Sequence, residues 1–172
     1  TEIQVALRPD GTGHEVSVTA GPVDGSTRTE RLRCRVVAAG AVPAPVHDLE
    51  AITARCTLLA TTADQLRSTG SLIDHGAHWT GAITATYAGE REELSRIELA
   101  EAYWPECGRY RLHPALLDTA VAEANCAPER RESGDSYLPF SYGRLRSYEP
   151  IPARFWVHLR HLAEPGASID RM

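Results

Sequence analysis

One carboxylate in the sequence stands where it could act as a general acid. The segment Leu112–Asp118 reads L-H-P-A-L-L-D, and its proline suits the first turn of a helix. The neighbours of Asp118 along this helix are mostly apolar: Leu116, Leu117, Ala120 and Val121. If they surround the carboxylate, its charged form is disfavoured, its pKa rises, and it becomes suited to donate a proton. The alternative is an ordinary carboxylate on the solvent face of an amphipathic helix.

The elements that must position this acid are predicted from the spacing of apolar residues. A helix is expected over Pro114–Asn125, with Leu117 and Val121 facing a sheet. Alternating residues predict strands at Glu2–Leu7, Glu15–Thr19, Leu32–Val36, Trp79–Tyr87, Leu94–Leu99, Tyr137–Tyr148 and Phe155–Leu162. This order of elements indicates an α+β fold, in which one helix lies on an antiparallel sheet.

Composition narrows the function classes. The 172 residues carry a net charge of −5, which argues against a nucleic-acid partner. No apolar run approaches the roughly 18 residues of a membrane-spanning helix. All 18 basic residues are arginine, which excludes a lysine Schiff base on this chain. The four cysteines are scattered without a C-x-x-C pair, so we expect no metal site and a reducing, cytoplasmic setting.

Three segments together resemble the dehydratase domain of modular polyketide synthases, mainly its second half. Leu112–Asp118 is similar to the L-H-P-A-L-L-D pattern that carries the family's catalytic aspartate. Leu138–Ser141 resembles the family's L-P-F-S segment, and Asp74–Trp79 resembles a variant of its D-Y-G-P-x-F segment. The order and spacing of the three also agree with the family.

The resemblance implies a hotdog fold that is part of a double hotdog, with each antiparallel sheet wrapped around a central helix. Residues 1–37 would be the closing strands of the first hotdog, and residues 38–48 a linker. Residues 49–172 would form the second hotdog, C-terminally incomplete, with its central helix at 114–125.

The resemblance also implies a reaction: removal of water from a β-hydroxyacyl thioester to give an α,β-enoyl thioester. A histidine of the first hotdog would take the α-proton, and Asp118 would help the β-hydroxyl to leave. The substrate would be carried on the phosphopantetheine of an acyl carrier protein, with no cofactor bound directly. Other synthase domains and a second copy of the chain are the further partners expected. Trp79, Leu138, Pro139, Phe140 and Tyr142 would line the substrate tunnel, or else pack in the core.

The sequence departs from the family at three places. None of the seven histidines lies in the family's H-x-x-x-G-x-x-x-x-P motif ahead of the first strands. We therefore expect that this chain begins after the catalytic base and is inactive alone. Ala122 replaces a glutamine or histidine four residues after Asp118, on the same helix face. His75 replaces a tyrosine, and is either a substitute partner for Asp118 or a loop histidine.

These departures leave two alternatives open beside a dehydratase. One is a non-catalytic, dehydratase-like scaffold that is kept for packing or dimerisation. The other keeps the fold and changes the chemistry to double-bond migration or ring closure by oxa-addition, since both need only part of the acid–base pair.

Overall fold

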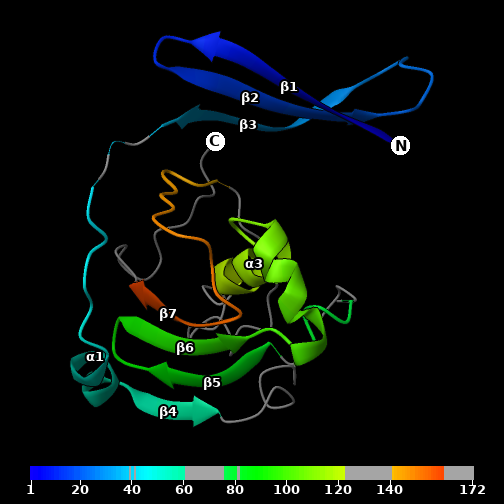
Figure 1. Ribbon diagram of the computed structural model, residues 1–172. Coiled ribbons are helices and arrows are strands. Elements are labelled where there is room, and N and C mark those ends of the chain that lie inside the picture. Colours follow the sequence, from blue (N-terminus) through cyan, green and yellow to red (C-terminus); the bar gives the residue numbers. More distant parts are fainter. Residues whose placement is uncertain (39, 41, 61–75, 81, 123–140, 161–172) are drawn as a thin grey trace. The chain divides into compact units, whose positions relative to one another are not determined.

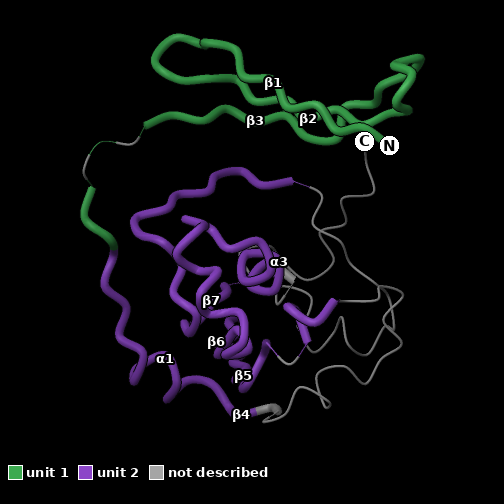
Figure 2. Tube along the Cα trace, turned by 45° about the vertical axis from the view of Figure 1, so that its right-hand side comes forward, with its two compact units in different colours: residues 1–44 green, residues 45–172 purple. Residues whose placement is uncertain are grey.

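The computed structural model describes residues 1–38, 40, 42–60, 76–80, 82–122 and 141–160. The chain divides into two compact units, Thr1–Ala44 and Pro45–Met172 (Figure 2). The division falls within residues 38–48, where the sequence predicts a linker. The assignment of the first unit to a first hotdog stays a prediction.

The first unit is an antiparallel sheet in the order β1-β2-β3. Its strands are β1 (Glu2–Asp10), β2 (Gly13–Gly21) and β3 (Thr29–Val37). The β1–β2 turn holds Gly11 at a φ of +57°, a conformation that glycine adopts without a steric penalty. All three strands were predicted, and each extends a few residues beyond the predicted range because the pairing continues to the turns.

The second unit places a helix on a four-stranded antiparallel sheet in the order β4-β5-β6-β7 (Figure 1). The strands are β4 (Thr57–Ala60), β5 (Ile83–Ala88), β6 (Glu92–Glu98) and β7 (Arg154–Arg160). The helices are α1 (Leu49–Arg55), the 3₁₀ helix η1 (Glu101–Arg109) and α3 (Pro114–Ala122). This arrangement confirms the predicted α+β class.

The core of the second unit lies between α3 and β6. Leu116 of α3 is fully buried with Ile97 of β6 and Leu99, and Ala120 packs against them one turn further along the helix. We expected Leu117 and Val121 to face the sheet, and this was wrong, because neither belongs to the apolar cluster that α3 forms with β6 among the described residues. The sequence has two adjacent leucines at 116 and 117, and helical periodicity alone chose the wrong one.

A buried polar pair also joins the strands of this sheet. Thr86 of β5 lies directly opposite Ser95 of β6, and their hydroxyl oxygens are 3.0 Å apart. Both residues are fully buried. Each hydroxyl therefore satisfies the other, and a pair of polar groups is tolerated in the sheet.

Two predicted strands need correction. The turn 77–80 occupies the start of the predicted strand Trp79–Tyr87, and β5 begins only at Ile83. In the predicted strand Tyr137–Tyr148, residues 141–148 form no strand, and the rest lies outside the described residues. Tyr142 and Leu145 are both exposed there, so neither face has a sheet to pack on.

Candidate active site

Asp118 lies in the second turn of α3. The helix begins at Pro114, and the Leu117 N–H donates to the carbonyl of His113, which starts the helical hydrogen bonding. Asp118 is exposed, so of the two interpretations of the sequence the structure favours a carboxylate on the solvent face of the helix. The reason is geometric: successive residues are about 100° apart around a helix, so Leu116 faces the sheet while Asp118 faces away from it.

The carboxylate of Asp118 has one well-defined partner. The indole Nε1–H of Trp79 donates to Asp118 Oδ2 at 2.8 Å, across 39 positions of sequence. An indole N–H can only donate, so Oδ2 is the acceptor in this hydrogen bond. Oδ1 takes no part in it. The structure thus brings together two of the residues that the sequence singled out.

The turn before β5 holds Trp79 in place. Its backbone N–H donates to the carbonyl of Gly76 at 3.0 Å, and its carbonyl accepts from Ala82 at 3.3 Å. Thr80 donates to the carbonyl of Ala77, which closes the same turn. The backbone that carries the indole is therefore fixed on both sides.

A second cluster lies beside this pair and joins the turn to η1. His78 Nε2 lies 3.2 Å from Glu106 Oε2, and its ring stacks on Tyr103 with centroids 3.8 Å apart. The same ring meets Trp79 edge-on at 6.2 Å. Thus the residue next to Trp79 connects the turn to η1 through both a hydrogen bond and ring packing.

His113 is buried directly before α3, with 2% of its surface exposed. Its ring meets Tyr110 edge-on at 5.3 Å, and its Nε2 lies 3.7 Å from Glu106 Oε2. Neither ring nitrogen has a hydrogen-bond partner among the described residues. His113 contacts the helix through its backbone carbonyl, which accepts from the Leu117 N–H at 2.9 Å.

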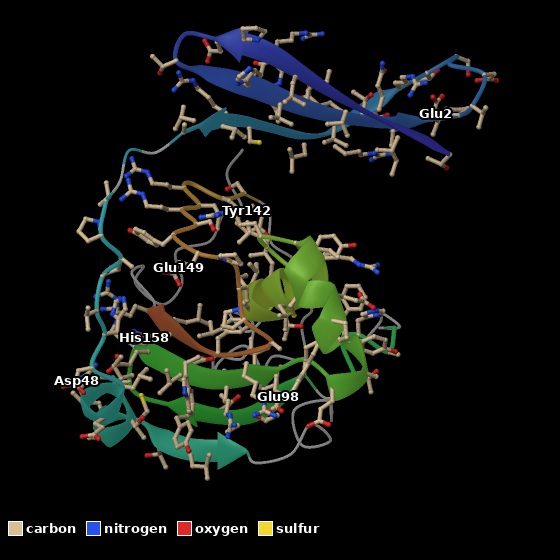
Figure 3. All side chains as sticks on the ribbon, in the orientation of Figure 1. Glu2, Asp48, Glu98, Tyr142, Glu149 and His158 are labelled. Carbon is tan, nitrogen blue, oxygen red and sulfur yellow. The ribbon has the colours of Figure 1, made fainter. Side chains whose placement is uncertain are left out.

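The structure describes only two of the remaining predicted site residues, Tyr142 and Ala122. Tyr142 lies on the segment before β7, labelled in Figure 3, and 63% of it is exposed. Ala122 is the last helical residue that the structure describes. Four others lie outside the described residues: His75, Leu138, Pro139 and Phe140. Their tunnel and support roles stay predictions.

Sequence reasoning missed the partners in η1. Glu106 and Tyr103 sit in a helix that contains Pro105, so the segment shows no regular helical pattern. His78 lies in the D-H-G-A-H-W segment, and its position next to Trp79 was the only signal available in the sequence.

Cys107 follows Glu106 in η1. Its burial raises the pKa of its thiol, and the nearby Glu106 carboxylate raises it further. A raised thiol pKa makes Cys107 a poor nucleophile.

The geometry supports proton transfer by one carboxylate. Asp118 is exposed and accepts a hydrogen bond through Oδ2, and the described residues make no hydrogen bond to its Oδ1, where a reacting group could bind. Within the described part of the chain, no three His, Cys, Asp or Glu side chains are grouped so as to hold a metal ion. In the same residues, no helix is long and apolar enough to cross a membrane.

Comparison with known proteins gives the family. A family model described as the polyketide synthase dehydratase N-terminal domain matches residues 44–169. The chain belongs to the polyketide synthase dehydratase family. Polyketide synthase PksM of Bacillus subtilis is 23% identical over 181 residues, which cover 97% of this chain and 4% of that protein. PksN of the same organism is 25% identical over 164 residues, covering 91% of this chain and 3% of PksN.

Solved structures of dehydratase domains share the fold. The dehydratase domain from the CurK module of the curacin polyketide synthase superposes with a TM-score of 0.77 at 21% identity. The match covers 97% of this chain and 59% of the CurK chain. The dehydratase domain from the terminal module of the rifamycin polyketide synthase gives 0.70 at 23% identity, over 94% of this chain and 58% of that one. These matches confirm the hotdog fold; the correspondence to a second half stays a prediction.

Proposed function

We propose that this chain is the dehydratase region of a polyketide synthase, with Asp118 as its general acid. The observation that carries the proposal is an accessible carboxylate at the end of the L-H-P-A-L-L-D segment, held by one hydrogen bond. Family membership supports it, since the matched family is named for dehydration. Inactive CurK dehydratase mutants have been solved with a histidine changed to phenylalanine or an aspartate changed to asparagine. Those changes agree with a histidine base and an aspartic acid partner.

In the proposed reaction, a histidine base removes the α-proton of a β-hydroxyacyl thioester. The electron pair of the broken C–H bond forms the C=C bond, and the β C–O bond breaks. Asp118 gives its proton to the departing hydroxyl from Oδ1, since Oδ2 accepts from Trp79. Water leaves, and acid–base elimination of this kind draws on no redox cofactor.

The same proposal names the partners. The substrate is presented on the phosphopantetheine of an acyl carrier protein, and the chain works with other synthase domains as a cytoplasmic homodimer. The relatives are large synthases of which this chain matches only a few per cent, which fits one domain region among many. Residues 1–172 contain no H-x-x-x-G-x-x-x-x-P motif, so we expect them to be inactive without a base from elsewhere.

Asp118→Asn in the polypeptide that contains this chain tests the proposal. Asparagine is nearly isosteric but cannot donate the same proton, so enoyl formation should fall by about 10²–10⁴-fold. Mass spectrometry of carrier-bound hydroxyacyl and enoyl species measures the change. Asp48→Asn is the matched control: Asp48 caps α1 through Oδ1, and asparagine caps about as well.

A scaffold function has one observation in its favour. Ala122 and His75 both replace the polar residues expected beside the acid, so the site has lost two family side chains together. A scaffold predicts that Asp118→Asn leaves the product profile unchanged. That outcome would remove Asp118 from the mechanism and establish the alternative.

A further inference from the structure

The contact between Trp79 and Asp118 assigns a role that the motif comparison does not give to this tryptophan. Its indole N–H donates to Asp118 Oδ2 at 2.8 Å, and no other side-chain hydrogen bond to this carboxylate is seen among the described residues. A hydrogen bond of this length restricts the rotation of the carboxyl group about its side-chain torsions. An exposed aspartate without such a bond would sample several rotamers.

The support behind Trp79 shows that the donor is itself fixed. Backbone hydrogen bonds to Gly76 and from Ala82 hold the turn on either side of the indole. The adjacent His78 pairs with Glu106 and stacks on Tyr103, which ties the turn to η1. Because the turn fixes the backbone of Trp79 and the His78 ring meets its indole edge-on at 6.2 Å, the indole is suited to orient a neighbouring side chain.

The residue types on α3 explain why the donor comes from another element. Position 122 lies one turn after Asp118, and a polar side chain there would share its helix face. Alanine has no side-chain atom that can donate a hydrogen bond. The indole of Trp79 supplies a donor from the turn before β5 instead.

We propose that Trp79 is a positioning residue for the general acid: it fixes Asp118 through Oδ2 and so presents Oδ1 to the hydroxyl of the substrate. This inference rests on the proposed dehydratase function. It makes Trp79 part of the acid's support and not of a purely apolar tunnel wall. It also predicts that a donor one helical turn after Asp118 can take over the role of the indole.

The test uses four variants in the polypeptide that contains this chain. Trp79→Phe keeps an aromatic ring and removes the N–H, so kcat should fall about tenfold or more with little change in KM. Trp79→Phe with Ala122→Gln should recover most of that loss, because a glutamine amide can donate to Asp118 across one turn. Trp79→Phe with Ala122→Leu adds similar bulk without a donor and should recover nothing. Trp156→Phe is the matched control for loss of a tryptophan, at a partly exposed position on β7.

The outcomes distinguish the positioning role of Trp79 from the proposed dehydratase function on which it rests. Rescue by glutamine and not by leucine establishes positioning, since a merely structural defect would not respond to a donor at 122. If Trp79→Phe turns over like Trp156→Phe, or if leucine rescues as well as glutamine, the positioning role is overturned. Loss of activity in Asp118→Asn would still leave the proposed function standing. Normal enoyl formation in Asp118→Asn would instead overturn both.

Discussion

The two sheets of this protein use the same alternating strands but bury very different amounts of apolar surface. In the first unit, Leu7, Val16 and Cys34 form one cross-strand row, and Val5, Val18 and Leu32 form the next. Leu7 is 63% exposed and Val5 58% exposed. In the second unit, Ile97 and Leu116 are fully buried, because α3 covers that face of the sheet.

The polar side chains differ in the same way. The first unit joins its strands with exposed ion pairs such as Arg35 with Asp10, whose side chains are each about half exposed. The second unit holds Glu92 between Arg55 and His158, and only 17% of the Glu92 side chain is exposed. Figure 3 labels His158 on β7 and Asp48 at the start of α1, the two elements that flank this cluster. The two sheets have similar alternating strands, so the strand pattern does not account for this difference. The burial of a side chain depends instead on whether a helix packs against its face of the sheet.

The largest expected effect on stability is the difference between truncating a buried leucine in the second unit and an exposed leucine in the first. Leu116→Ala should lower the free energy of unfolding by about 2–5 kcal/mol, since it opens a cavity between α3 and β6. Leu7→Ala should change it by less than about 1 kcal/mol, because Leu7 is already exposed. Urea denaturation followed by circular dichroism measures both. Equal losses would mean that the first unit is covered as well as the second.

The next largest effect is the pH dependence of the free energy of unfolding, which should differ between the partly buried ion pairs of the second unit and the exposed ion pairs of the first. Hydrogen bonds from Arg55, and then from His158, lower the pKa of Glu92 from 4.5 to about 2. Because the folded pKa is the lower one, the charged carboxylate stabilises the fold above about pH 4.5, and this stabilisation is lost as the pH falls toward 2. Glu92→Gln should therefore cost on the order of 1–2 kcal/mol at neutral pH and nearly nothing at the acid end.

Glu30→Gln in the first unit is the matched control for that change. A hydrogen bond from Arg33 lowers the pKa of Glu30 too, but its side chain is exposed and screened by solvent. Unfolding free energies across the acid range should therefore change less than for Glu92→Gln. A larger pH-dependent change for Glu30→Gln would reverse the comparison.

The smallest expected effect is the salt dependence of an exposed pair. Arg35→Gln removes the 2.7 Å contact to Asp10 and should cost at most about 1 kcal/mol at low salt. At about 1 M salt the Debye length is about 3 Å, so the difference between wild type and variant should vanish. Hydrogen exchange of the β1 and β3 amides reports it locally. A difference that persists at high salt would show that Arg35 stabilises the sheet by packing.

Local pattern predicted much of the fold. The strands of the first unit and the helix starting at Pro114 follow from alternation and from a proline followed by apolar residues. The short elements α1, β4 and η1 were missed, because each has only a few apolar residues and its stability comes from contacts with the rest of the unit. Helix α1 had one usable signal, the capping residue Asp48.

The residue proposed as the general acid could be named from the sequence, but its contacts could not. Asp118 belongs to a motif that is continuous in sequence, so it can be found without a structure. Its hydrogen bond to Trp79 and the pairing of His78 with Glu106 join positions 28 to 39 residues apart. Such contacts depend on how a turn and two helices pack, and periodicity carries no information about them.

The hydroxyl pair of Thr86 and Ser95 has a consequence for how the β5–β6 hairpin folds. A slip of two residues would keep the same faces inward but place Thr86 opposite Ile97 or Glu93. The two hydroxyls would then lose their hydrogen bond to each other, and breaking a buried bond of this kind costs about 1–3 kcal/mol. The pair therefore favours the native register of β5 and β6. Ile97 lies on the same strand as Ser95 and packs against α3, so this register also determines the position of α3, and of Asp118, along the sheet.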